Sequence, residues 1–140
     1  MKDEFMTDTE QYMSIREMCE AFDVTARTLR FYESKELLFP IRQGTRRSFT
    51  RKDRARLKLI LRAKRFGFSL EEIRQWLDMY DPKTQNLNQT IIAIDMCKVR
   101  LAELIEQRNE MNEAIAELED QIETADQMVA QLTKPAAATG

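Results

Sequence analysis

The sequence of 140 residues has no histidine and only three glycines, three prolines and two cysteines. Without histidine it lacks the commonest general base, and it has no glycine-rich phosphate loop or carboxylate pair outside solvated helix faces. These absences disfavour an enzyme. Low glycine and proline with high charge predicts a helix-rich soluble fold rather than a β-sandwich or a disordered chain. Two cysteines, Cys19 and Cys97, are too few for a disulfide framework and indicate a reducing, cytoplasmic compartment.

Long apolar runs are also missing, since none approaches the roughly 20 residues that a membrane span needs. Residues 1–11 are acidic and lack the apolar core of a signal peptide, so we expect a disordered N-terminus there. Residues 133–140 are mostly small, and we expect them to form a disordered tail.

Charged residues are abundant, and although the net charge is only −2, they are unevenly distributed along the chain. Residues 12–80 carry sixteen Lys and Arg against nine Asp and Glu, whereas residues 81–140 carry five against eleven. Within residues 42–65, eleven basic residues accompany a single acid, Asp53. Such a field attracts polyanions, although a solvated basic face would leave the same pattern.

Capping signals and breakers mark the expected elements. Ser14 and Ser69 are each followed three residues later by glutamate, which is a capping box, and Thr50 is followed by Asp53 in a weaker version. Gly44 predicts a hairpin turn between two short strands. The expected elements are helices 14–21, 25–35, 51–66, 69–80 and 87–132, and a hairpin of strands 39–42 and 47–49.

The first two predicted helices match a helix-turn-helix. An ordinary amphipathic helical hairpin would show the same local pattern. Arg27, Thr28 and Arg30 remain outside on the second helix, where arginine can hold guanine edges and threonine can contact bases or phosphates. The residues expected to fill the small core are Ile15, Met18, Phe22, Val24 and Leu29.

The predicted hairpin adds a second basic element. Arg42, Arg46 and Arg47 cluster around it, and arginine on such a wing neutralises phosphates and releases counterions. The helix expected over 51–66 adds basic residues that include Lys64 on the face opposite its apolar residues. A basic reader of double-stranded DNA is therefore the favoured interpretation.

Motifs spread over residues 13–80 resemble the DNA-binding domain of the MerR family of regulators. Their order and spacing carry the resemblance, and the long predicted helix is similar to the family's antiparallel dimerisation helix. The matching segments are Thr28-Leu29-Arg30-Phe31-Tyr32-Glu33, Leu37-Leu38-Phe39-Pro40-Ile41-Arg42, Arg47-Ser48-Phe49, Asp53, Leu57, Leu59-Ile60-Leu61-Arg62-Ala63-Lys64 and Gly67-Phe68-Ser69-Leu70-Glu71-Glu72-Ile73.

The resemblance implies a homodimer on a pseudo-palindromic promoter, which it bends and untwists so that RNA polymerase can engage. It implies that Arg30 and Tyr32 contact the DNA backbone, that Thr28 lies near the bases, and that the wing arginines contact DNA. Thr45-Arg46 departs from the Gly-Tyr that usually precedes the family's wing arginine. The predicted DNA-contacting residues are Thr25, Arg27, Thr28, Arg30, Tyr32, Arg42, Arg46, Arg47 and Lys64.

The predicted helix over 87–132 has the heptad pattern of a coiled coil. Eleven of the twelve a and d positions from Ile94 to Leu132 are apolar, and Arg108 is the exception. A core helix of one large domain is disfavoured, because no other apolar surface remains to receive it. The predicted dimerisation residues are Ile94, Leu101, Leu104, Arg108, Met111, Ile115, Leu118 and Ile122.

Charge predicts that the two helices run antiparallel. Positions beside the seam are basic near the start, at Lys98 and Arg100, and acidic later, at Glu119 and Asp126, so a parallel pair would set like beside like. A centre between Asn109 and Glu110 places Arg108 beside Met111 of the partner subunit and separates the two Cys97 thiols by about 37 Å along the helices.

The sequence therefore predicts an all-α fold with a small β-hairpin wing: a winged helix-turn-helix domain and a long antiparallel coiled-coil helix. The expected division is a DNA-binding domain over 12–80, a linker over 81–86 and the dimerisation helix over 87–132. The alternatives left open are an architectural DNA-binding protein without a promoter role and a coiled-coil adaptor.

Nothing in the sequence identifies a metal signal. The family's metal-sensing members carry cysteines at both ends of the dimer helix, and no such cluster occurs here, so no metal or cofactor is expected. Cys19 is expected in the core and Cys97 in the seam. The stretch 57–70 resembles a subgroup linked to branched-chain amino acid and fatty acid catabolism. That resemblance implies a catabolic effector, such as an acyl-CoA, near Trp76 and Tyr80 where the coil meets the DNA-binding domain.

Overall fold

The computed structural model describes residues 12–134 of the chain. The chain divides between Ile94 and Asp95 into two compact units, which we describe separately. The predicted disordered segment 1–11 and most of the predicted tail 133–140 lie outside the described residues.

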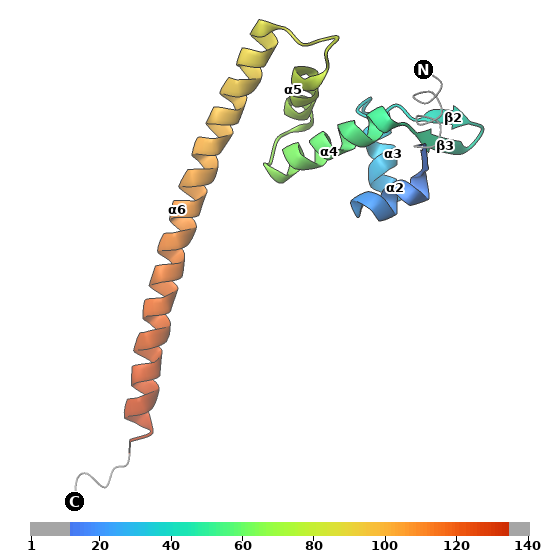
Figure 1. Cartoon of the computed structure of the whole chain (residues 1–140). Coiled ribbons are helices and arrows are strands. Elements are labelled where there is room, and N and C mark those ends of the chain that lie inside the picture. The colour runs from blue at the N-terminus through green and yellow to red at the C-terminus, as the bar shows by residue number, and fades with distance from the viewer. Residues whose placement is uncertain (1–11, 135–140) are drawn as a thin grey trace, which may run out of the picture. The chain divides into compact units, whose positions relative to one another are not determined.

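The first unit begins with a short strand and two short helices (Figure 1). Strand β1 covers Met13–Ser14, helix α2 covers Ile15–Phe22 and helix α3 covers Ala26–Ser34. The predicted capping box of α2 is present, because the Ser14 hydroxyl accepts from the backbone of Glu17 while the Glu17 carboxylate accepts from the backbone of Ser14.

Two strands that follow α3 form a three-stranded antiparallel sheet with β1. Strand β2 (Ile41–Gln43) and strand β3 (Arg46–Phe49) form the predicted hairpin, which we call the wing, and Gly44 turns it with a φ of 64°. β1 pairs with the other edge of β3. This third strand was not predicted, because it has only two residues and the second of them, Ser14, is also a helix cap.

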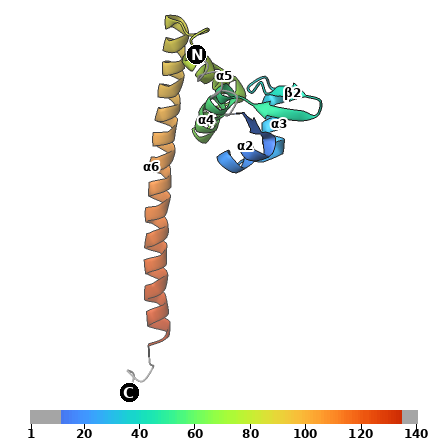
Figure 2. The same ribbon diagram turned by 45° about the vertical axis from the view of Figure 1, so that its right-hand side comes forward.

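Two more helices follow the wing in the first unit. Helix α4 covers Arg51–Arg65 and helix α5 covers Leu70–Tyr80, and each begins with the predicted capping box. Gly67 lies between them with a φ of 88°, a left-handed conformation that favours glycine after a helix end. Figures 1 and 2 show the wing at the edge of this unit beside α3.

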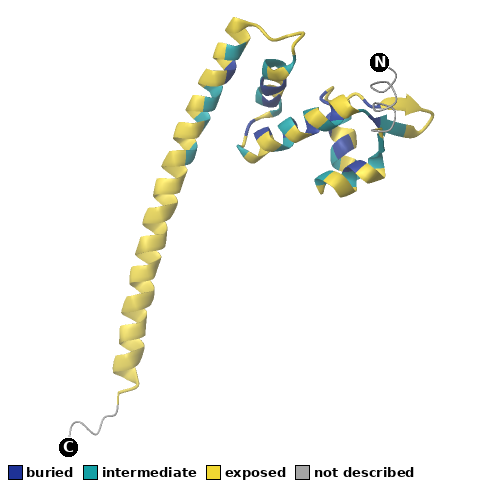
Figure 3. Ribbon diagram, in the orientation of Figure 1, coloured by how far each residue is buried: buried dark blue, intermediate teal, exposed yellow. Residues whose placement is uncertain are grey.

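The buried side chains of the core come from α2, α3, β3, α4 and α5, where α2 packs against α3 and β3 and α4 packs against α5; Figure 3 shows their buried faces. Met18 and Leu29 are fully buried as predicted, but Ile15, Phe22 and Val24 are only partly buried. The expectation that these three residues fill the core is therefore met only in part, because α2 is short and its packing neighbours α3, β1 and β3 leave them partly exposed. The other fully buried side chains include Leu37, Leu38, Phe49, Leu57 and Ile60.

A hydrogen-bonded turn joins α5 to the last helix. The backbone N–H of Thr84 and of Gln85 donate to the Asp81 carbonyl at 3.1 and 2.8 Å. The Asn86 side chain accepts from the backbone of Gln89 at 2.8 Å, which caps the start of helix α6 (Leu87–Leu132). The bounds of α6 equal those expected from the sequence, and the bounds of the other four helices differ from the expected ones by at most one residue at each end.

The second unit begins at Asp95 and contains most of the 46 residues of α6. Almost all of these residues are exposed (Figure 3). Within residues 12–134, no helix combines the length and the apolar character needed to cross a membrane. The mainly helical fold with a hairpin wing and a long C-terminal helix is confirmed.

Candidate nucleic-acid interface

Helix α3 is fixed at its start by two threonines. The Thr25 hydroxyl caps the helix by accepting from the backbone N–H of Thr28 at 3.1 Å, and the two hydroxyl oxygens lie 2.9 Å apart. Leu29 and Tyr32 point into the core. Because a helix turns about 100° per residue, Arg27 and Arg30 then lie on the exposed side, where a groove-reading helix needs them.

A surface cavity of about 250 Å³ lies beside this helix. Four of its lining residues are predicted DNA contacts, Arg27, Thr28, Tyr32 and Lys64, and the fifth is Phe31. Since Lys64 comes from α4, the fold brings two separate basic elements to one place. A cationic hollow of this kind fits a phosphate of the DNA backbone.

Tyr32 differs in part from its expected role. Its ring is only 2% exposed, and burial raises the pKa of its phenol above the ordinary value. The side chain is therefore part of the core, with an edge that reaches the cavity. Contact of its hydroxyl with DNA stays a prediction.

The wing presents its arginines in register. Arg42 lies directly opposite Arg47, and Gln43 lies opposite Arg46. Arg46 is exposed near the turn, whereas Arg42 and Arg47 are both bonded to Glu33 of α3. The structure thus ties the wing to the helix-turn-helix through a carboxylate that the sequence reading did not single out.

The base of the wing is held by a buried carboxylate, Asp53, which is 2% exposed. It accepts from the backbone of Phe39 at 2.9 Å and from both the backbone and the hydroxyl of Thr50 at 3.1 Å. Nearby, Arg56 donates from Nε to the Leu37 carbonyl at 2.7 Å. These bonds fix the segment that leads from α3 into the wing.

Phe31 and Glu33 are the site residues that the sequence reading missed. Phe31 is 43% exposed on α3, and the Lys35 ammonium lies 5.6 Å from its ring centroid. An apolar side chain at an outward helical position was the available signal for Phe31. For Glu33 the signal was a lone acid on a basic face.

The predicted dimer seam is uncovered in the single chain. Leu104 is partly exposed and Arg108 is exposed. The other seam residues are exposed by between 43% and 63%, namely Ile94, Leu101, Met111, Ile115, Leu118 and Ile122. Contiguous exposed apolar side chains of this kind mark an interaction surface.

Both cysteines are free thiols that are partly buried. Cys19 is only partly buried rather than enclosed in the core, and partial burial raises the pKa of Cys97. A raised pKa lowers the thiolate fraction at neutral pH. Among the described residues, no group of three or more Cys, Asp and Glu side chains has the arrangement of a metal site.

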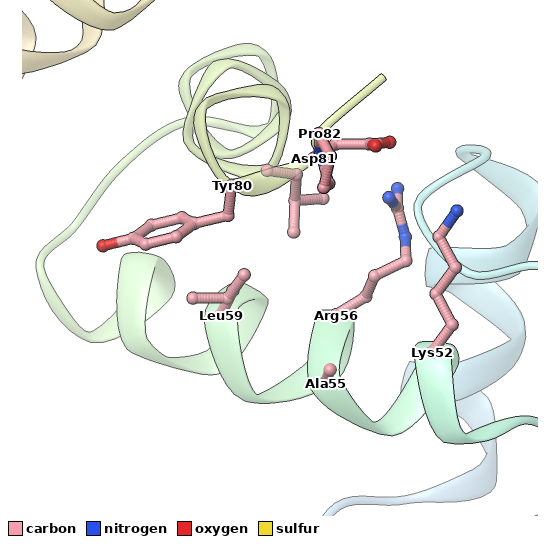
Figure 4. Close-up of a pocket in the computed structure, with 8 residues that line it drawn as sticks. Lys52, Ala55, Arg56, Leu59, Tyr80, Asp81 and Pro82 are labelled. Atoms are coloured by element: carbon pink, nitrogen blue, oxygen red, sulfur yellow. The ribbon is translucent and has the colours of Figure 1, made fainter. Parts of the chain in front are cut away.

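A second cavity, of about 310 Å³, lies between α4 and the end of α5 (Figure 4). Leu59, Leu77, Tyr80 and Pro82 form its apolar lining, and Lys52, Arg56 and Asp81 bring charge to it. Trp76 does not line this cavity. It packs against Phe66, Phe68 and Tyr80, with ring centroids 5.8 to 5.9 Å away.

A helix-turn-helix with an arginine-bearing wing defines a winged helix-turn-helix DNA-binding protein. Residues 13–80 match the family described as MerR HTH family regulatory protein, and residues 54–120 match the family described as MerR, DNA binding. The HTH-type transcriptional regulator HmrR of Rhizobium leguminosarum bv. viciae is 31% identical over 108 residues, which cover 76% of this chain and 81% of that protein. The chain therefore belongs to the MerR family of DNA-binding transcriptional regulators, which are not enzymes.

Other similar proteins agree with this assignment. The HTH-type transcriptional regulator ZntR of Escherichia coli (strain K12) is 39% identical over 72 residues, about half of each chain (49% and 51%). The crystal structure of a MerR family transcriptional regulator from Bacillus cereus superposes with a TM-score of 0.55 at 26% identity, covering 91% of this chain and 90% of that one.

Proposed function

We propose that this regulator binds a pseudo-palindromic promoter as a homodimer and distorts the DNA to control transcription by RNA polymerase. The observation that carries the proposal is the convergence of Arg27, Thr28 and Lys64 on one cavity beside α3, with the wing arginines on the adjoining hairpin. Two copies of this surface would read two half-sites, and DNA deformation between them supplies indirect readout.

The test compares affinity for a promoter duplex with affinity for random duplex of equal length. We expect a preference of roughly 1,000-fold or more for the promoter, which is the lower range for specific DNA-binding proteins. Equal affinities would instead support the architectural alternative. Arg30→Ala should weaken binding about tenfold or more while the dimer stays intact, because a hydrogen bond to a charged group such as a backbone phosphate contributes about 1.5–3 kcal/mol. Arg16→Ala, on the exposed side of α2, is the matched control.

The dimer we propose is an antiparallel coiled coil through α6. Its support is the seam of exposed apolar residues and the reversal of charge between Lys98 and Glu119. In this register the two Cys97 thiols lie about 37 Å apart along the helices. Oxidised protein should therefore run as a monomer on a non-reducing gel, and a Cys97–Cys97 dimer band would show that the register is wrong.

We infer that the signal is a catabolic small molecule that binds the cavity beside Tyr80. The resemblance of residues 57–70 to a catabolic subgroup supports the chemical class, and the apolar lining with Lys52 and Arg56 suits an acyl group that carries an anion. Thermal shift with short-chain acyl-CoA should raise the Tm of the wild type. Leu59→Trp, which fills the cavity, should abolish the shift, whereas Val99→Trp, at an exposed position of α6 outside the a and d positions, should retain it.

A further inference from the structure

Two of the three arginines of the wing, Arg42 and Arg47, share one carboxylate in the described structure. Glu33 of α3 accepts from Nε of Arg47 at 2.6 Å and from Nη1 of Arg42 at 3.1 Å. Because Arg42 lies on β2 and Arg47 on β3, one side chain links the recognition helix to both strands of the wing. The three charges together leave one net positive charge.

The Glu33 carboxylate offsets a charge repulsion between two arginines of the hairpin. Arg42 and Arg47 are direct cross-strand partners, and like charges in that position destabilise a strand pair. An anion between the guanidinium groups offsets this repulsion. In the free protein that anion is Glu33, and a DNA phosphate carries the same charge and can also accept two N–H groups of an arginine.

The two contacts are not equivalent. The Arg47 side chain is 19% exposed and its contact is the shorter one, whereas the Arg42 side chain is 50% exposed and its contact is longer. A guanidinium has five N–H donors, and the half-exposed Arg42 can turn them toward solvent or a phosphate. Arg47 is held inside the wing, and Arg42 can exchange its partner.

The Glu33 carboxyl is ionised at neutral pH. Partial burial acts to raise the pKa of its carboxyl, but the hydrogen bonds and charges of Arg47 and Arg42 outweigh burial and lower the pKa below its ordinary value. At neutral pH the carboxylate therefore competes with phosphate for the guanidinium of Arg42.

We propose that Glu33 is a positioning residue for DNA specificity, which fixes Arg47 within the wing and occupies Arg42 until a correctly placed phosphate displaces it. A duplex that binds without a phosphate in that place makes no contact with Arg42, and the affinity for non-specific DNA therefore stays low. The inference rests on DNA binding as proposed above, and it adds a residue that need not touch the DNA.

The test is the isosteric change Glu33→Gln, measured on promoter and random duplex over a series of salt concentrations. Releasing Arg42 should add about one phosphate contact on random DNA, which steepens the slope of log K against log salt by about 0.9. The variant should bind random DNA more tightly than wild type at 50 mM salt. That advantage should shrink about 3.5-fold by 200 mM salt, which is the same slope expressed as a ratio. The ratio of promoter to random affinity should fall.

Two controls separate this role from a general loss of negative charge. Glu36→Gln removes the same charge from an exposed position three residues away, and its slope should match that of wild type. Adding Arg42→Ala to Glu33→Gln should remove the extra slope, because Arg42 is the group that becomes available.

A further variant does not depend on Glu33→Gln folding well. Arg42→Ala alone, at a half-exposed side chain, should weaken promoter binding more than random binding, because wild-type Arg42 is held by Glu33 on random DNA. Equal weakening on both duplexes would overturn the inference, as would an unchanged slope and ratio for a folded Glu33→Gln variant. If the wild type binds no duplex even at low salt, the proposed function fails and this inference fails with it.

Discussion

Asp53 is a buried acid within the most basic stretch of the chain, and it has no role in attracting DNA. Its carboxylate is 2% exposed and accepts from two backbone N–H groups and one hydroxyl. Its energetic role is therefore to satisfy donors at the start of α4 and at the base of the wing.

Replacement of this carboxylate tests that role. Asp53→Ala leaves donors of Phe39 and Thr50 unpaired and should lower the free energy of unfolding by about 3 kcal/mol. Asp53→Asn keeps one acceptor oxygen and should lose less. Urea denaturation measures both variants, and an Asp53→Ala protein as stable as wild type would refute this assignment.

Glu33 gives the chain a defined dependence of stability on pH. Its pKa is lowered in the folded state by Arg47 and Arg42, so the pair stabilises the fold above the unfolded pKa, near the ordinary value of 4.5, and loses that effect as pH falls through the lowered pKa. The stability difference between wild type and Glu33→Gln should be constant from pH 7 to about pH 5.5 and shrink below about pH 4. Chemical denaturation across this range measures it, and a difference that grows on acidification would contradict the ion-pair assignment.

At the scale of elements, the local signals predicted helices better than they predicted the sheet. The three capping boxes at Ser14, Thr50 and Ser69 are all formed, because the bonds that make them depend on residues only three apart. β1 could not be predicted, since its pairing with β3 depends on residues more than thirty positions away. A segment of two residues carries no sequence signal that would predict its pairing with a distant strand.

The candidate site divides in the same way. Helical periodicity places Arg27 and Arg30 outside α3, and the turn at Gly44 places the wing. The sharing of Glu33 between two arginines depends on how the wing folds against α3, which no local pattern encodes. Tyr32 illustrates the reverse case, because the family motif indicated a DNA contact but not that the residue is largely buried in the core.

The junction between α4 and α5 depends on one glycine. Gly67 has a φ of 88°, and a side chain in that conformation is strained. Gly67→Ala should therefore lower the free energy of unfolding by about 1 kcal/mol, while the exposed Ala55→Gly should also cost about 1 kcal/mol through helix propensity alone. Only the first change should alter the α4–α5 packing, which near-ultraviolet circular dichroism of Trp76 reports. An unchanged Trp76 signal in Gly67→Ala would contradict this view of the junction.

At the scale of the whole molecule, the proposed dimer would couple stability and DNA binding through α6. The seam residues of α6 are exposed in a single chain, and in the dimer that we propose they are buried by association. A charge at the seam should therefore abolish dimerisation and, with it, the gain in affinity from binding two half-sites.

Leu104→Asp tests this coupling. Sedimentation should show a monomer, and promoter affinity should fall 100-fold or more, as expected when two linked contacts become one. Glu106→Asp, away from the a and d positions, is the control and should stay dimeric. A dimeric Leu104→Asp protein would show that the seam is elsewhere on α6.

The most direct test of the central claim is footprinting of the dimer on the promoter upstream of its own coding sequence, with transcription measured on the same template. We predict two protected half-sites related by a dyad, enhanced cleavage between them where the DNA is distorted, and a change in transcript level that Arg30→Ala abolishes. Uniform protection of promoter and random DNA, with no change in transcription, would contradict the account.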